Sequence, residues 1–284
     1  MTSPDSGRAE PPIDGSGTGR ARCVLAPNPS LMTLDGTNTW LIGAPDAAEV
    51  VVVDPGPDDD AHLDRVAGIA GQGGKRIGAI LLTHGHADHS EGARALAERA
   101  GAEVRAVDRA HRLGLEGLPP GAVLAMAGCE IEVIATPGHS ADSVCLYLRD
   151  DRAVLTGDTV LGRGTTVIGS DGDLADYLGS LGTLRALADS VELAALLPGH
   201  GPLLADPIAT LDYYITHRHQ RLAEVRAALA AGDRTMADIV ARVYADVDRA
   251  LWPFAEFSLR AQLRYLRDRG ELVSDVRETL REDR

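Results

Sequence analysis

Residues 83–89 have the composition and spacing of a metal-binding loop. The sequence reads Thr-His-Gly-His-Ala-Asp-His, so His84, His86, Asp88 and His89 lie within six residues of a chain that has nine histidines in all. Imidazole and carboxylate groups suit Zn²⁺, Fe or Mn. Only glycine and alanine separate them, and small residues let the backbone curl tightly around an ion. The spacing therefore favours a metal site over a solvated polar turn with incidental histidines.

The elements on either side must present this loop. An apolar run over residues 77–82 leads into it, and a helical pattern over 90–100 leads out of it. The ligands therefore lie on a predicted strand-to-helix loop, where side chains can converge on one point. Turn-forming residues separate a predicted helix at 61–70 and further strands at 22–25, 39–43, 50–53, 103–106, 129–134, 143–148, 153–155 and 193–197.

A second pattern links distant parts of the chain. Asp54, His84, His139, Asp158 and His200 each lie at or just beyond the end of an apolar strand, next to Gly or Pro. Taken singly, His139 or His200 would more often be structural. Strand ends in a packed sheet share an edge, so we predict that the five side chains meet at one rim. Asp54 is either a plain loop residue or a carboxylate that accepts a hydrogen bond and steadies the metal loop.

The length of 284 residues suits a domain of roughly 200 residues with a small additional unit. We predict a disordered tail at 1–20, a catalytic domain at 21–210 and a helical unit at 211–284. The first 20 residues are rich in Ser, Pro, Gly and Asp, which is not typical of a signal peptide. No run of 18 apolar residues occurs, so no membrane partner is expected. The three cysteines are widely spaced and favour a reduced, cytoplasmic protein.

The net charge of −14 is unevenly distributed. Residues 218–284 have 13 arginines and 12 acidic residues, about +1, which leaves 15 basic and 30 acidic residues, or −15, in residues 1–217. The acidic part argues against indiscriminate nucleic-acid binding. Bound cations would offset part of this charge if the predicted ligands cluster.

Three helices are predicted after residue 207. The first runs to about 231, the second opens at a capping box formed by Thr235 and Asp238, and the third covers about 255–269. A strand at 271–274 would follow, and this order suits a small winged-helix-like unit. A polar stretch on the first of these helices forms either a solvated face or a lid over the site: His217, Arg218, His219 and Arg221.

Five motifs, taken in chain order, resemble those of the metallo-β-lactamase superfamily. They are Asp54, the H-x-H-x-D-H cluster at 84–89, Gly138-His139, Gly157-Asp158 and Gly199-His200. The resemblance implies an α/β fold, namely an αββα sandwich of two facing mixed sheets with outer helices and metals at the rim. It also implies the ligands: His84, His86 and His139 for one metal, Asp88, His89 and His200 for a second, and Asp158 as a bridge.

Two positions separate the chain from lactam-cleaving members. Those dinuclear enzymes usually have Cys where this chain has Asp158, and they usually lack a ligand histidine where this chain has His89. The motif is similar to the glyoxalase-II-like and nuclease-like branches. Asn28-Pro29 with residues 34–39, residues 161–166 and the winged-helix-like tail resemble a narrower group, called β-lactamase-like protein two. That group is associated with zinc-dependent cleavage of single-stranded RNA.

The resemblance implies a hydrolase with two zinc ions per chain and a metal-bridging hydroxide as nucleophile. Asp88 would steer the water or protonate the leaving group. Thr165 and Thr166 either line the substrate cleft or belong to a β-prone connector. Single-stranded RNA is the preferred substrate and a thioester or ester, as in glyoxalase II, the close alternative. A weak β-lactamase, a mononuclear iron oxygenase and a binding protein with a vestigial metal site are further alternatives. The arginines predicted to contact RNA phosphates are Arg218, Arg221, Arg260, Arg264 and Arg267. The last three share one helical face, and a salt-bridged surface would have the same spacing.

Overall fold

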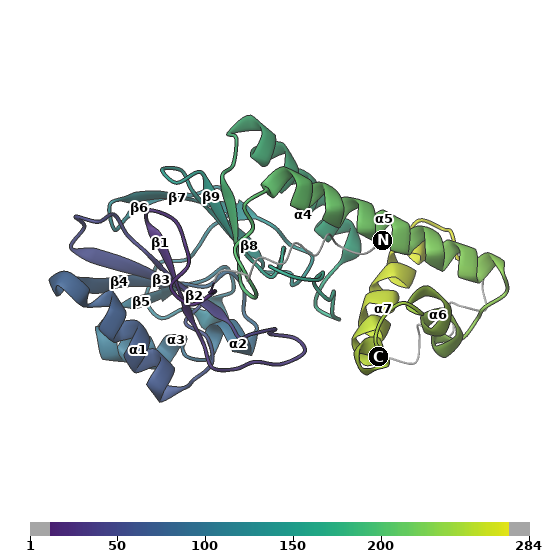
Figure 1. Cartoon of the computed structure of the whole chain (residues 1–284), viewed down its shortest axis with the longest axis horizontal. Helices are drawn as coiled ribbons and strands as arrows, with labels where there is room; N and C mark the ends of the chain where they lie inside the picture. The colour runs from purple at the N-terminus through teal and green to yellow at the C-terminus, as the bar shows by residue number, and fades with distance from the viewer. Residues whose placement is uncertain (1–11, 273–284) are drawn as a thin grey trace.

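Two five-stranded mixed sheets face each other in the structure, a computed structural model that describes residues 12–272, and helices cover their outer faces (Figure 1). This arrangement confirms the predicted αββα sandwich. The first sheet contains β1 (Ala21–Leu25), β2 (Asn38–Ile42), β3 (Glu49–Val53), β4 (Arg76–Leu81) and β5 (Glu103–Arg105), in that order. The second has the order β10-β9-β8-β7-β6, with β6 (Val123–Met126), β7 (Cys129–Ala135), β8 (Val144–Leu148), β9 (Ala153–Gly157) and β10 (Ala195–Pro198).

The helices follow the same chain order. They are α1 (Asp60–Ala70), α2 (Ala87–Ser90), α3 (Ala93–Ala100), α4 (Leu174–Ser190), α5 (Pro207–Ala230), α6 (Met236–Val243) and α7 (Trp252–Asp268), with short 3₁₀ turns at Gln72–Gly74, Arg109–His111 and Arg249–Leu251. In Figure 1 the long helix α5 leads away from the sandwich to α6 and α7, which form a separate helical group.

Parallel strand pairs explain why the polar residues gather at one edge. β3 pairs in parallel with β4, and β9 with β10, whereas β1–β2, β2–β3 and the pairs among β6, β7, β8 and β9 are antiparallel. The carboxyl ends of parallel neighbours lie at the same edge of a sheet. Asp54 and the 83–89 loop therefore leave the first sheet side by side, and Asp158 and His200 leave the second in the same way.

Apolar layers hold the sheets and helices together. Trp40, Val53 and Leu81 of the first sheet pack against residues of the second, including Ile131 and Leu155. The outer face of the first sheet packs on α1 and α3, and that of the second on α4 and α5. β3 has four consecutive buried valines, as expected for a strand that is covered on both faces.

Helix α4 is the main element that the sequence analysis missed. It begins after Asp173, whose carboxylate accepts hydrogen bonds from the backbone N–H groups of Ala175 (2.7 Å) and Asp176 (3.0 Å). Its buried side chains include Tyr177, Leu181 and Leu184. The two glycines and the scattered polar residues in its sequence obscure the helical period, so packing against the second sheet decides this helix.

The helical unit differs from the prediction at two points. The capping box is confirmed, because the Thr235 hydroxyl accepts from the Asp238 backbone N–H at 3.1 Å. The last helix begins at Trp252 and not at residue 255, since Pro253 lies in the first turn, where its missing N–H is no loss. Residues 271 and 272 form no strand, and the rest of the strand predicted at 271–274 lies outside the described residues.

The predicted disordered tail needs a correction over residues 12–20. The Gly15 backbone N–H donates to the Cys23 carbonyl at 2.9 Å, and the Arg20 guanidinium pairs with Asp151 at 2.9 Å. Asp14 forms an ion pair with Arg65 of α1. These tertiary contacts order a segment whose composition alone predicts disorder, whereas residues 1–11 lie outside the described part of the chain.

The three cysteines are free and buried. Within residues 12–272, the structure contains no helix that combines the length and the apolar character needed to cross a bilayer.

Candidate metal centre

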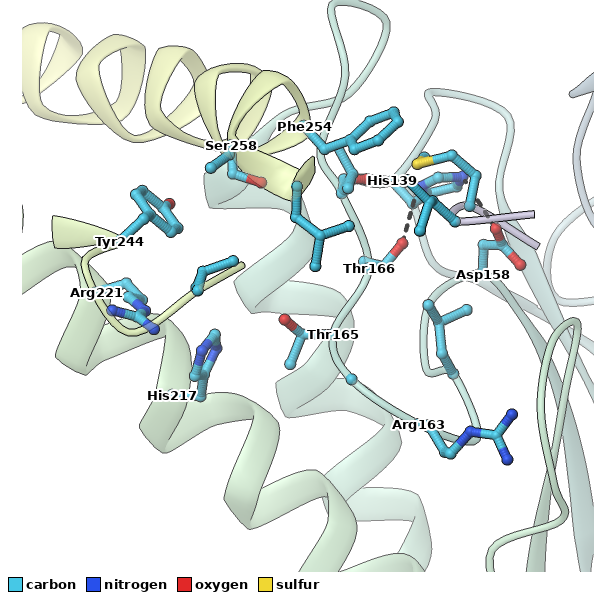
Figure 2. Close-up of a pocket in the computed structure, with 18 of the residues that line it drawn as sticks. His139, Asp158, Arg163, Thr165, Thr166, His217, Arg221, Tyr244, Phe254 and Ser258 are labelled. Atoms are coloured by element: carbon cyan, nitrogen blue, oxygen red, sulfur yellow. Dashed lines mark hydrogen bonds and ion pairs between the residues drawn. The ribbon is translucent and has the colours of Figure 1, made fainter. Parts of the chain in front are cut away.

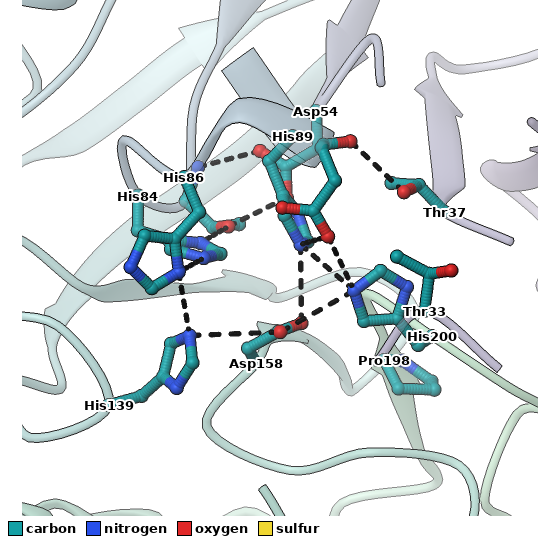
Figure 3. A network of polar contacts seen from close by, with 12 residues as sticks. Thr33, Thr37, Asp54, His84, His86, His89, His139, Asp158, Pro198 and His200 are labelled. Carbon is teal, nitrogen blue, oxygen red and sulfur yellow. Dashed lines mark hydrogen bonds and ion pairs between the residues drawn. The ribbon is translucent and has the colours of Figure 1, made fainter. Parts of the chain in front are cut away.

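The rim of the sandwich brings together every residue that the sequence analysis named as a metal ligand. His84, His86, Asp88 and His89 lie on the loop and short helix after β4, and Asp158 and His200 follow β9 and β10. His139 lies on the turn after β7 (Figure 3). Their ligand atoms form two groups in which nitrogen and oxygen atoms lie within 4.8 Å of one another: His84, His86 and His139, and Asp88, His89 and His200.

The first ligand group is compact. His86 Nδ1 lies 3.1 Å from His84 Nε2 and 3.0 Å from His139 Nε2. His84 and His139 are buried, whereas the His86 side chain is 37% exposed. This group is therefore the more open of the two.

The second ligand group lies deeper. His89 Nε2 and His200 Nε2 are 3.2 Å apart, and Asp88 Oδ2 lies 3.2 Å from His200 Nε2. Both histidine side chains are completely buried, and Asp88 is 32% exposed. Asp88 therefore presents part of its carboxylate to the opening of the site.

Asp158 lies between the two groups. Its Oδ2 is 3.7 Å from His139 Nε2 and 3.4 Å from His200 Nε2, and its Oδ1 is 3.3 Å from His89 Nε2 (Figure 3). This carboxylate is nearly buried, and Oδ1 has no hydrogen-bond partner. A Cβ at Gly199 would lie 2.7 Å from Oδ1, so only glycine lets the backbone approach this carboxylate. A bridging position between two cations matches this geometry.

Asp54 supports the metal-binding loop at residues 83–89 through hydrogen bonds. It has a positive φ of 51°, an uncommon conformation for a residue other than glycine. Its carboxylate accepts from the Thr83 N–H (2.8 Å), the Thr83 hydroxyl (2.6 Å) and His89 Nδ1 (2.9 Å). Asp54 is close enough to His84 and His89 to count as a ligand. Because these donors occupy both of its oxygens, we assign it the supporting role.

The donor set fits a bound metal. In each of the five histidines one ring nitrogen faces the centre, and the other lies beside an oxygen atom that can accept its proton. A hydrogen bond of this kind fixes the tautomer and leaves the inward nitrogen free to bind a metal. The partners are Thr83 Oγ1 for His84 (3.0 Å), Asp171 Oδ2 for His86 (2.9 Å), Asp54 Oδ2 for His89 (2.9 Å), the Val167 carbonyl for His139 (2.9 Å) and the Gly36 carbonyl for His200 (3.1 Å).

The electrostatics of the two groups differ. Burial, together with the charge of His89, holds the pKa of His84 well below its ordinary value, and burial also lowers the pKa of His139. Burial opposes the protonation of His89, but Asp158 and Asp54 outweigh it and raise its pKa well above the ordinary value. Asp158 similarly outweighs burial at His200 and raises its pKa to about 9. His84 and His139 therefore offer neutral imidazoles, and a cation can replace the protons of His89 and His200.

One contributor to the site was missed by the sequence analysis. Asp171 orients His86, but it lies in a polar loop whose sequence resembles any solvated turn. Thr166 is buried and its hydroxyl lies 3.1 Å from His139 Nδ1, so it contacts a ligand, whereas Thr165 lines a pocket. The His111 ring packs against the metal-binding loop, because a Cβ at Gly85 would be 2.5 Å from its Nε2.

A pocket of about 320 Å³ begins at His139 and Asp158 and extends toward the helical unit (Figure 2). Its walls are largely apolar and include Leu161, Val247 and Phe254. The exposed side chains of Leu31 and Met32 also line it. A substrate with an apolar portion could therefore place its reacting group at the metal centre and its apolar portion between the sandwich and the helices.

The arginines predicted to contact RNA have partners within the chain. Arg218, Arg221 and Arg264 donate to backbone carbonyls of Thr166, Val243 and Gly169, respectively. Arg221 also pairs with Asp246 at 3.0 Å, and Arg267 pairs with Asp268 at 2.9 Å. Arg260 and Arg264 line a second pocket.

Comparisons with known proteins agree with this geometry. The model of the metallo-beta-lactamase superfamily matches residues 32–200, and that of the beta-lactamase associated winged helix domain matches residues 235–278. The chain is 33% identical over 232 residues to a beta-lactamase-like protein 2 homolog of Caenorhabditis elegans, covering 78% of this chain and 76% of the relative. It is 31% identical over 252 residues to an atrochrysone carboxyl ACP thioesterase of Aspergillus fumigatus, covering 81% and 77%.

A solved structure shows the same fold. A beta-lactamase domain protein from Burkholderia ambifaria superposes with a TM-score of 0.77 at 24% identity, over 95% of this chain and 92% of that one. The superfamily model spans more than half of the chain, and the winged-helix model matches residues 235–278 of the helical unit. The chain therefore belongs to the metallo-beta-lactamase superfamily and has the winged helix domain that is associated with it.

Proposed function

We propose that this chain is a dinuclear zinc hydrolase that cleaves thioesters or esters of apolar acyl groups. The observation that carries the proposal is the apolar pocket that opens directly on His139 and Asp158. The hydrolase class follows from the superfamily, and the substrate follows from the chemistry of the pocket walls. An acyl chain can bury its methylenes there at about 0.8 kcal/mol each.

The proposed metal is zinc, and the proposed number is two. Zinc is commonly bound by histidine nitrogen and carboxylate oxygen. The centre offers three histidines in one group, two histidines and an aspartate in the other, and Asp158 between them. Bound zinc would supply Lewis acidity, which polarises a carbonyl and lowers the pKa of water toward roughly 7.

The chain's own residues supply orientation and proton transfer. Asp158 is almost buried, and its pKa is held well below the ordinary range because the His200 and His89 side chains outweigh burial. It therefore stays ionised and can neutralise positive charge from both groups. Asp88 is partly exposed, and its carboxylate can accept a proton from water and deliver it to the leaving group. No serine or cysteine nucleophile is needed.

The pocket supports an acyl substrate over a polynucleotide. Leu161, Val247, Leu251 and Phe254 offer no hydrogen bonds to a sugar–phosphate backbone. The Arg218 guanidinium near the pocket donates to the Thr166 carbonyl. A relative named as an atrochrysone carboxyl ACP thioesterase is 31% identical to the chain and covers 81% of it.

Single-stranded RNA is the second candidate. It is favoured by the winged helix domain, because helix-turn-helix units of this general kind often bind nucleic acids. The arginines on α5 and α7 would have to exchange their intramolecular partners for phosphates. Such contacts should weaken with salt, by about −0.7 in the slope of log affinity against log salt for each phosphate.

The test has two steps, which are a comparison of substrates and a substitution that fills the pocket. Zinc-loaded protein is assayed on acyl thioesters of increasing chain length, on single-stranded RNA and on a chromogenic cephalosporin. Thr165→Phe places an aromatic ring in the pocket. We expect this variant to raise KM for long acyl chains by about tenfold and to leave short ones nearly unchanged. Thr183→Phe, on the exposed side of α4, is the matched control.

Two results would contradict the proposal. Cleavage of RNA without turnover of any thioester would replace it with the nuclease interpretation. A KM that is independent of chain length in both the parent protein and Thr165→Phe would show that the pocket does not bind the acyl group.

A further inference from the structure

The loop between β9 and α4, residues 161–173, holds two ligands of the first group in place. We call it the connecting loop. The Val167 carbonyl and the Thr166 hydroxyl both contact His139 Nδ1, at 2.9 and 3.1 Å (Figure 2). The Asp171 carboxylate contacts His86 Nε2 at 2.9 Å. The orientation of two of the three histidines therefore depends on where this loop lies.

The end of the connecting loop also packs directly on the turn that carries His139. The Asp173 backbone N–H donates to the Gly138 carbonyl at 3.0 Å. A Cβ at Gly172 would lie 2.4 Å from the Gly138 carbonyl oxygen and 2.5 Å from that of His139. The two backbones are in contact, so a shift of the loop has to move the turn or break this contact.

Two arginines of the C-terminal helices donate hydrogen bonds to backbone carbonyls of the connecting loop. Arg218 of α5 is only 4% exposed, and its Nη2 donates to the Thr166 carbonyl at 2.5 Å. Arg264 of α7 donates from Nη2 to the Gly169 carbonyl at 3.0 Å and to the Gly172 carbonyl at 3.3 Å. The three carbonyls flank the residues that touch the ligands. An arginine presents several donors in a rigid fork, which suits it to hold loop carbonyls.

We propose that Arg218 and Arg264 are positioning residues through which the C-terminal helices set the metal affinity of the first ligand group. Without these donors the connecting loop would sample other positions, and metal binding would then have to order it again. The free energy needed to order the loop would then lower the metal affinity of the group that contains His86 and His139. The second group is oriented instead by Asp54 and by the Gly36 carbonyl. The connecting loop reaches this group only at its first residues, where the Gly162 N–H donates to the His200 carbonyl at 2.8 Å and Arg163 pairs with Asp35, and the two C-terminal arginines contact the loop farther along. The inference rests on the metal centre of the proposed function.

Each ligand group has to be measured separately. His200→Ala disables the second group and leaves the first, whereas His86→Ala does the reverse. Arg218→Met and Arg264→Met are introduced into both backgrounds, and zinc affinity is measured by competition with a fluorescent chelator. We expect each substitution to weaken the first group by about tenfold, within the roughly 10- to 100-fold range for residues that orient ligands. The second group should change by less than about twofold.

Controls and a converse variant sharpen the test. Arg226→Met on α5 and Arg267→Met on α7 remove arginines that pair with Glu271 and Asp268, and they should leave both affinities unchanged. Arg264→Lys keeps one donor and should restore part of the affinity. Gly172→Ala leaves both arginines intact but pushes the loop away from the His139 turn, so it should also weaken the first group selectively.

A readout in the metal-free protein separates this inference from the proposed function. Histidine side-chain NMR reports which ring nitrogen carries the proton. In the parent chain we expect a proton on Nδ1 of His139 and on Nε2 of His86, and mixed tautomers in Arg218→Met and Arg264→Met. If the parent chain bound no metal, the proposed function would fail, and the tautomers would still decide the inference. Unchanged tautomers, or equal losses of affinity in the two groups, would overturn it.

Discussion

The two ligand groups of the centre are built in different ways. In the second group, His89 and His200 are completely buried, and their outward nitrogens contact Asp54 and the Gly36 carbonyl, close to strands of the first sheet. In the first group, His86 is 37% exposed, and its partner Asp171 lies on a long loop. The second group therefore depends on the sandwich and the first residues of the connecting loop, whereas the first group also depends on the part of that loop that the C-terminal helices contact.

This difference concerns how firmly each of the two ligand groups is held in place. Strand ends in a packed sheet can hold ligands rigidly, because moving them would disturb the core. A loop tied down by hydrogen bonds can adjust at lower cost. The pocket opens beside His139 and Asp158, on the adjustable side. Under the proposed function, a substrate in this pocket would therefore meet the loop-supported side of the centre.

The largest effect is expected from Asp158→Asn, because Asp158 lies between the two groups. The amide lacks the negative charge that would offset both metals, so both affinities should fall together. We expect activity to drop by about 10²- to 10³-fold, similar to the loss of one strong electrostatic contact in an active site. The metal-free fold should persist, as measured by circular dichroism. Near-normal turnover would remove Asp158 from the shared position.

Asp54→Asn should act mainly on the second group. The amide presents a donor where Thr83 and His89 also donate, so His89 loses its orientation. Zinc affinity in the His86→Ala background should fall by about 10- to 100-fold. The first group should lose less, through Thr83 and His84 only. Asp189→Asn, at an exposed position of α4, is the control, and a greater loss in the first group would reverse the comparison.

Thr166→Val tests the first group with a smaller change. Valine keeps the shape of threonine but removes the hydroxyl beside His139 Nδ1, while the Val167 carbonyl remains as a partner. We expect zinc affinity in the His200→Ala background to fall by about three- to tenfold, at or below the lower end for orienting residues. Thr183→Val removes a helix-surface hydroxyl and should have no effect. An effect on the second group alone would contradict the assignment.

The smallest expected effect is on the pH dependence of the free energy of unfolding, through His217 of the helical unit. Burial, with Arg218 and Arg221 nearby, lowers the pKa of His217 to about 4, against 6.5 for the free side chain. Between these values the unfolded chain binds a proton that the folded chain does not, so the free energy of unfolding falls as pH falls through this window.

His217→Gln should flatten that dependence in metal-free protein. Urea unfolding at pH 7 and pH 4.5 gives the measurement, and the variant should lose less stability than the parent between these values. Because ligand histidines also titrate, only the difference between the two proteins is used. An identical loss in both would show that His217 does not sense the buried environment between α5 and the turn at Asp246.

The fold and the ligands were predictable for related reasons. The valine run of β3 and the apolar runs before His84 and Asp158 mark buried strands, and their polar ends mark a rim. In the 83–89 loop the ligands are close in sequence, so local spacing alone brings them together. His139 and His200 are single residues, and the superfamily motifs identified them where spacing could not.

The sequence by itself determined the ligand loop, the strands that present it and the sandwich that buries them, because each has a local pattern of apolar, small and polar residues. Only the tertiary structure decided how the ligands are supported. Asp171 is an ordinary loop aspartate until the connecting loop returns to His86. Arg218 and Arg264 contact backbone carbonyls, which every residue has, so the residue types do not reveal these contacts. Two of the arginines predicted to contact RNA, Arg218 and Arg264, contact the loop beside the metal centre, and the residue types could not indicate this because contacts between distant segments depend on how the chain packs.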